Sequence, residues 1–227
     1  MLLCVYFCHG TVLAIDNIPL EVLPIKTGYL ILYNAVSAIL WATVLGRTVG
    51  ANVLRGPAFV HVSTGDFVLW TQTLMIMDVL HGLFGIVRTD PVTAAAQVAS
   101  RYVAYPFPAL CASPVYSSML FAWSVTEVIR YTYLAVKLGG YEPAAFTWVR
   151  YSSYLILYPL GITSEMIQMW RALTPAGLKF GPLYQLFLGI SLFVIWPIGA
   201  YILIGHMNRQ RRKVLAAQKS ENLKATQ

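Results

Sequence analysis

Charged residues are scarce in this sequence. They make up 11% of its 227 residues, whereas hydrophobic residues make up 58%. A soluble domain ordinarily carries about 25% charged residues, so this composition indicates an integral membrane protein. A single membrane domain can contain the whole length, and no second globular domain is expected.

Cysteine is also rare, and its spacing excludes several classes of site. Cys4, Cys8 and Cys111 form no CxxC pair and have no histidine at ligand spacing, which argues against a disulfide framework or a metal site. None is followed six residues later by arginine, so the phosphate-binding loop of a cysteine phosphatase is absent. The sequence contains no P-loop and no GxGxxG motif. We therefore expect neither a metal nor a cofactor.

Positive charge, in contrast, gathers at the C-terminus. A basic segment that follows the last apolar stretch is typical of a cytosolic end near anionic lipid. Nucleic-acid binding is not expected, because no folded domain accompanies the cluster. Its members are Arg209, Arg211, Arg212, Lys213, Lys219 and Lys224.

Six stretches approach the roughly 20 apolar residues that a membrane span requires. They are Tyr29–Gly46, Phe67–Val87, Ala94–Ala112, Val115–Leu138, Ala144–Trp170 and Pro182–Gly205. We predict an all-α, six-helix membrane bundle over residues 26–206, between an uninformative apolar segment (1–25) and a basic cytosolic tail (207–227). Most Lys and Arg residues that flank the spans fall on the side of the tail, which predicts that both termini are cytosolic.

Ionisable side chains interrupt several spans, where each costs roughly 2.5–3.5 kcal/mol on insertion scales. Glu127 and Arg130 lie three residues apart and can neutralise each other on one helix face, as structural support or as the wall of a binding site. Asp78 and His81 have the same spacing and indicate either a structural pair or a proton relay. We expect the members on the fourth and fifth spans to face a common interior. These members are Glu127, Arg130, Arg150 and Glu165.

Tyr158 and Glu165 form a different kind of pair. Seven residues are nearly two helical turns, so both side chains should lie on one face, with Cα atoms roughly 10 Å apart. Pro159 removes a backbone donor and Gly161 loosens the helix between them. A phenol and a buried carboxyl at this separation suit proton transfer to a substrate that lies between them. Taken alone, the spacing is a weak signal.

The residues around Tyr158 and Glu165 strengthen this signal. The chain resembles the very-long-chain (3R)-3-hydroxyacyl-CoA dehydratases, also called protein-tyrosine-phosphatase-like proteins. The resemblance runs in order from about Tyr29 to Trp170 and is most specific between Trp123 and Glu165. The segments that carry it are Tyr29–Asn34, Leu80–Gly82, Gln97–Arg101, Ala122–Tyr131, Trp148–Ser152 and Leu157–Glu165.

This resemblance implies a six-span protein of the endoplasmic reticulum membrane that encloses an acyl-chain tunnel. It implies the third step of fatty-acid elongation, loss of water from a (3R)-3-hydroxyacyl-CoA, alongside other enzymes of the cycle. The catalytic pair of the family falls on Tyr158 and Glu165. Residues for substrate binding or support fall on Arg101, Glu127, Arg130, Arg150 and Gly161.

The reaction needs a base for the α-proton and an acid for the leaving hydroxyl. We first assign Glu165 to the hydroxyl and Tyr158 to the α-carbon, and the sequence leaves the reverse assignment open. A non-catalytic scaffold or acyl-CoA-binding protein is the alternative, favoured if the two side chains enter different cavities. A proton-coupled transporter should show internal repeats, which the sequence lacks.

Overall fold

The computed structural model describes residues 23–87 and 108–225, and every regular element in those ranges is helical. The predicted all-α class is therefore confirmed for this part of the chain. The helical elements, in chain order, are α1 (Leu23–Arg55), η2 (Pro57–Phe59), α2 (Val60–Leu74), α3 (Ile76–Leu83), α5 (Pro108–Cys111), α6 (Pro114–Leu138), α7 (Ala144–Ser152), α8 (Tyr154–Phe180), α9 (Pro182–Ile190), η3 (Ser191–Ile195) and α10 (Trp196–Ala225).

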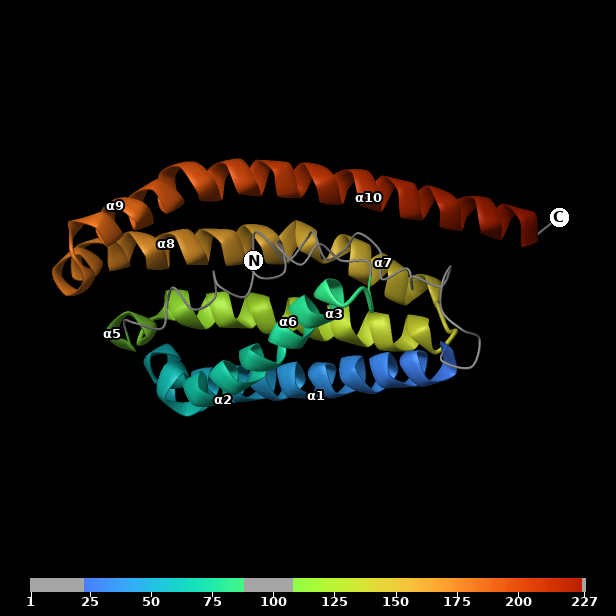
Figure 1. Ribbon diagram of the computed structural model, residues 1–227, viewed down its shortest axis with the longest axis horizontal. Coiled ribbons are helices and arrows are strands. Elements are labelled where there is room, and N and C mark those ends of the chain that lie inside the picture. Colours follow the sequence, from blue (N-terminus) through green and yellow to red (C-terminus); the bar gives the residue numbers. More distant parts are fainter. Residues whose placement is uncertain (1–22, 88–107, 226–227) are drawn as a thin grey trace.

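The long helices α1, α6, α8 and α10 run roughly along one axis (Figure 1). Helix α6 packs against α1 on one side and α8 on the other, and α10 packs against α7 and α8. Ser118 and Ser164 share a hydrogen bond of 2.9 Å across the α6–α8 contact. The expected contact between the fourth and fifth spans is therefore confirmed.

Alternate helices run in opposite directions, so the two ends of the bundle carry different loops (Figure 1). One end holds the start of α1, the end of α6, helix α7 and the C-terminal half of α10. The other end holds two corners at Gly56 and Gly181. Both glycines adopt φ near +90° with ψ near 170°, a backbone conformation that is essentially restricted to glycine.

Two predicted spans are broken into shorter helices. The second is interrupted at Met75 between α2 and α3, where Met75 and Asp78 make short-range backbone hydrogen bonds to Gln72 and Met75. The fifth is interrupted at Ser153 between α7 and α8, and α8 then continues to Phe180. Hydropathy did not predict these breaks, because a one-residue turn barely changes the mean over a 20-residue window. The third span lies almost entirely outside the described residues.

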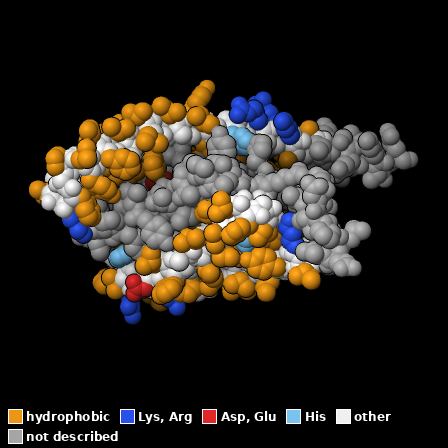
Figure 2. All heavy atoms as spheres, viewed as in Figure 1, with side chains coloured by type: hydrophobic (Ala, Val, Ile, Leu, Met, Phe, Trp, Pro, Cys, Tyr) orange, Lys and Arg blue, Asp and Glu red, His pale blue; other side chains and the backbone are white. Residues whose placement is uncertain are grey.

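Two helical stretches of the described chain are long and apolar enough to cross a membrane, Ile25–Arg55 and Pro182–Ala216. Figure 2 shows hydrophobic side chains over much of the visible face, with Lys and Arg gathered toward its ends. Leu32 and Ile39 on α1 and Leu183 and Tyr201 on the other stretch are largely exposed. This surface suits a lipid environment, and the count of six spans remains a prediction.

Most of the basic tail is helical. Helix α10 runs without interruption from Trp196 to Ala225 and includes most of it. Two hydrogen bonds join α10 to the end of α7 and to the start of α8. The Tyr154 hydroxyl donates to Asn208 over 2.6 Å, and the Arg211 Nε donates to the Ser152 hydroxyl over 3.2 Å. The first part of the tail is therefore attached to the helical bundle.

Candidate active site

Glu165 lies in the middle of α8 and is only 6% exposed. Two tryptophans donate to its carboxylate. The indole Nε1 of Trp123, on α6, donates to Oε1 over 2.7 Å, and that of Trp196, at the start of α10, donates to Oε2 over 3.0 Å. Each carboxylate oxygen therefore receives an N–H from a different helix.

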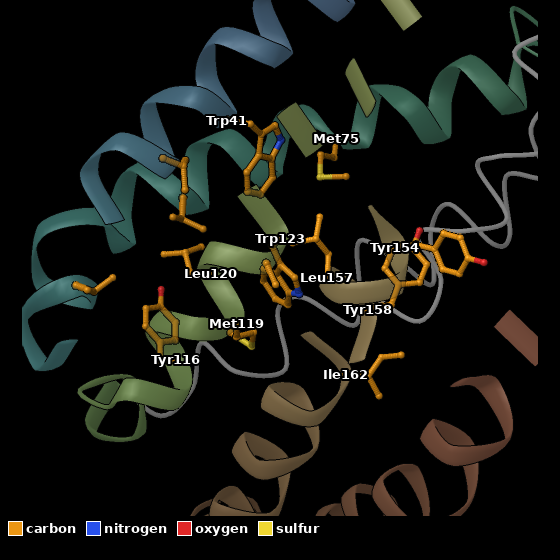
Figure 3. Close-up of a cluster of buried hydrophobic side chains, with 14 of the residues drawn as sticks. Trp41, Met75, Tyr116, Met119, Leu120, Trp123, Tyr154, Leu157, Tyr158 and Ile162 are labelled. Carbon is orange, nitrogen blue, oxygen red and sulfur yellow. The ribbon is translucent and has the colours of Figure 1, made fainter. Parts of the chain in front are cut away.

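Tyr158 is 2% exposed and lies on the same helix as Glu165. Ile162, between them in the sequence, is also buried, so the three side chains share the inward face of α8. Figure 3 shows Tyr158 beside Tyr154 and near Leu157. The Tyr154 and Tyr158 rings meet edge to face, with centroids 5.6 Å apart. The predicted common face of Tyr158 and Glu165 is thus present.

The helix continues through Pro159 and Gly161, and Gly161 is buried. Pro159 carries no N–H, but its carbonyl oxygen accepts a hydrogen bond of 2.7 Å from the Thr163 hydroxyl. The predicted loosening produces no interruption of α8 between the two candidate catalytic residues. Their spacing is therefore set by continuous helical geometry.

Arg130 forms the centre of a second buried polar cluster. Its Nε donates to Glu127 over 2.7 Å, and its Nη2 donates to Asp78 over 3.2 Å. Glu127 is fully buried and Arg130 is 1% exposed. The neutralisation predicted from their spacing of three residues is confirmed, and Asp78 adds a second carboxylate from α3.

Asp78 also accepts hydrogen bonds from two phenols. The Tyr33 hydroxyl donates to Oδ1 over 2.9 Å, and the Tyr131 hydroxyl donates to Oδ2 over 2.8 Å. His81 forms a hydrogen bond with a third phenol, that of Tyr29, with 2.8 Å between its Nε2 and the Tyr29 hydroxyl oxygen. Asp78 and His81 therefore each have a hydrogen-bond partner on α1. The cluster joins α1, α3 and α6, which favours the structural interpretation over a proton relay.

Of the remaining predicted residues, Arg150 lies near the end of the bundle that carries α7. Arg150 is on α7 and is buried, as expected for an interior side chain. Arg101 lies outside the described residues. At the turn between α6 and α7, Lys137 and Glu142 form a half-exposed ion pair of 2.9 Å. The hydrogen bonds from Tyr133 and then from Lys137 hold the pKa of Glu142 below its usual range.

Two tryptophans of this site were not predicted from the sequence. Trp123 belongs to the most specific block of the resemblance and Trp196 lies in an apolar span, but no motif assigns either residue a role. A signal was present in both, because an indole N–H inside a membrane span needs an acceptor.

In the described residues, no group of three or more His, Cys, Asp or Glu side chains could hold a metal ion.

Comparison with known proteins gives the family. The chain is 43% identical over 197 residues to the probable very-long-chain (3R)-3-hydroxyacyl-CoA dehydratase of Schizosaccharomyces pombe, covering 84% of this chain and 94% of that one. It is 33% identical over 206 residues to the Caenorhabditis elegans very-long-chain (3R)-3-hydroxyacyl-CoA dehydratase hpo-8, covering 82% and 94% of the two chains.

A third relative is the Arabidopsis thaliana very-long-chain (3R)-3-hydroxyacyl-CoA dehydratase PASTICCINO 2, 30% identical over 216 residues, which cover 87% of this chain and 97% of that one. No solved structure matches the chain. The profile described as "Protein tyrosine phosphatase-like protein, PTPLA" matches residues 72–217, and the chain belongs to this protein tyrosine phosphatase-like family.

Proposed function

We propose that this protein is a very-long-chain (3R)-3-hydroxyacyl-CoA dehydratase, a lyase that converts its substrate to the trans-2-enoyl-CoA. The observation that carries the proposal is the placement of Tyr158 and Glu165 on one buried face of α8, with Glu165 held by two indoles. The names of the relatives support the same activity. No metal or other cofactor is required for this reaction.

The hydrogen bonds favour a division of labour that reverses our assignment from the sequence. Two N–H donors stabilise the anionic form of a carboxylate. Glu165 therefore acts as the base that removes the α-proton. Tyr158 gives its hydroxyl proton to the leaving hydroxyl, which departs as water while the C–O bond breaks and the double bond forms. Return of the proton from Glu165 to Tyr158, through a water molecule, restores the starting state.

In this proposal, residues 26–206 form the catalytic domain and cross the membrane six times. The arrangement accounts for the difference in positive charge between the two ends of the bundle. Lys26, Lys137 and the basic part of α10 lie at one end, whereas Arg55 and Lys179 lie at the other (Figure 1). The more positive end is the cytosolic one under the positive-inside rule. Both termini are then cytosolic, and the membrane is that of the endoplasmic reticulum.

The substrate then enters from the cytosolic end. Its acyl chain occupies an apolar tunnel between the helices, and its CoA phosphates stay at the mouth, near Arg212 and Lys213. Five further residues are expected to contribute to substrate binding or structural support. They are Arg101, Glu127, Arg130, Arg150 and Gly161. Other enzymes of the elongation cycle supply the 3-hydroxyacyl-CoA and consume the enoyl-CoA.

Purified protein in nanodiscs should convert a long-chain (3R)-3-hydroxyacyl-CoA to the trans-2-enoyl-CoA, followed by absorbance of the enoyl thioester or by mass spectrometry. The (3S) isomer is the matched control and should react far more slowly. Tight binding of the (3R) substrate without turnover would favour the non-catalytic alternative.

The proposed orientation predicts where glycosylation can occur. An Asn-X-Ser/Thr acceptor with a flexible flank, inserted at the Gly181 corner, should be glycosylated in microsomes, because that corner faces the lumen. The same insertion at the Gly140 turn, between α6 and α7, should remain unmodified. Glycosylation at the Gly140 turn alone would indicate the opposite orientation. Glycosylation at both sites would contradict the span assignment.

A further inference from the structure

We propose that Trp123 and Trp196 are positioning residues that hold the Glu165 carboxylate from two sides and set its direction toward the substrate. This inference rests on the proposed function and deepens it. The two indole N–H groups meet Oε1 and Oε2 at 2.7 Å and 3.0 Å. The donors belong to α6 and α10, so the carboxylate of α8 is fixed between two neighbouring helices.

The chemistry of the donors explains why indoles suit this role. An indole N–H donates and cannot accept, and it carries no charge. It can therefore orient a carboxylate without neutralising it, whereas an arginine would form an ion pair. A carboxylate offers about four lone-pair positions, and each indole N–H uses one of them. Trp123 is only 4% exposed, which keeps competing water away from its bond.

A local distortion brings Trp196 to this position. Residues Ser191–Ile195 form a π-helical turn, closed by the backbone N–H of Trp196 donating to the Ser191 oxygen. Pro197 follows immediately and supplies no N–H to the Phe193 carbonyl, which its ring also crowds. An extra residue in one turn shifts the helix beyond it by one position, or about 100°. Without the shift, Ile195 would take the place of Trp196.

A purely structural role for the two indoles makes a different prediction from a positioning role. If they only fill space, their replacement lowers stability and leaves the rate per folded molecule unchanged. If they orient Glu165, replacing either tryptophan lowers kcat, and this effect disappears when the Glu165 carboxylate is absent. Trp170 gives a matched control on α8, because its ring packs edge to face against Phe193 and is 60% exposed.

The first experiment measures kcat and KM of Trp196→Phe and Trp123→Phe in nanodiscs. Loss of a hydrogen bond to a charged group should lower kcat roughly 10–100-fold, with KM within about threefold because the acyl and CoA contacts remain. Trp170→Phe should keep wild-type kcat. Unchanged kcat in both site variants would overturn the proposal.

A double-variant cycle identifies the path of the effect. In a Glu165→Gln background, adding Trp196→Phe should lower the residual rate less than about twofold, because groups that act as a unit are non-additive. The full loss in that background would overturn the positioning role. The activity of the wild-type protein tests the proposed function separately. An inactive wild-type protein would refute that function.

A second measurement does not depend on turnover or on the folding of the tryptophan variants. The chain has six tryptophans, so a ¹⁵N spectrum of the wild-type protein shows six indole N–H signals. Glu165→Gln should move the signals of Trp123 and Trp196 and leave that of Trp170 in place. If neither of the two signals moves, the indoles do not donate to Glu165 in the membrane protein, and the proposal is overturned.

Discussion

Replacing Tyr158 by phenylalanine should lower the single-turnover rate of dehydration by roughly 10²–10⁴-fold, the usual scale for a positioned acid or base. The change removes one oxygen and keeps the ring, so the edge-to-face contact with Tyr154 should survive. Substrate affinity should change far less, because the acyl chain and CoA are held elsewhere. Single-turnover kinetics in nanodiscs, with thermal stability measured alongside, tests this directly.

Glu165→Gln should cause a comparable loss, because it keeps the shape of the side chain and removes its ability to take a proton. The combined variant should lose much less than the product of the two effects. Tyr201→Phe is the matched control, since Tyr201 is 83% exposed and should retain full activity. Near-normal turnover in Tyr158→Phe would remove this residue from the catalytic pair.

A substrate with a better leaving group separates the two roles. Chloride departs without a proton, so elimination from a 3-chloroacyl-CoA of matching configuration needs the base but not the acid. If Glu165 is the base, Tyr158→Phe should process this substrate at close to the wild-type rate, and Glu165→Gln should remain slow. The opposite pattern would assign the base to Tyr158. The uncatalysed elimination is measured without protein and subtracted.

Sequence periodicity and spacing predicted the parts of this structure that depend on local geometry. The fourth span was expected at Val115–Leu138 and is α6, Pro114–Leu138. The Glu127–Arg130 ion pair follows from two residues three apart on one helix face. Both results rest on the regular α-helix, whose repeat is the same in any tertiary context.

Features that depend on contacts between helices could not be predicted from the sequence. Asp78 was paired with His81 from their spacing, but its acidic group contacts Arg130 and two tyrosines from other helices. The break at Met75 that turns α3 toward these partners leaves almost no trace in hydropathy. Trp196 reaches Glu165 only because a π-helical turn precedes Pro197. Pro197 is compatible with a distortion there, but none was predicted, and the direction of such a distortion depends on packing.

The buried cluster around Arg130 leads to a prediction about stability. Glu127→Ala removes a carboxylate that is fully buried and 2.7 Å from the Arg130 Nε. Breaking a buried ion pair on one side costs about 3–5 kcal/mol in soluble proteins, because the remaining charge keeps its desolvation penalty. Asp78 compensates in part, since it contacts the same guanidinium. We expect lower yield and a lower melting temperature, with the rate per folded molecule largely retained.

Glu142→Ala is the matched control, because it removes the same group from an ion pair that is half exposed. Exposed pairs contribute about 0–1 kcal/mol, so this variant should express and melt like the wild-type protein. The comparison separates burial from the loss of a negative charge as such. A Glu127→Ala protein that is abundant, melts normally and does not turn over substrate would show that Glu127 acts on the reaction, and the Arg130 cluster would then belong to the active site.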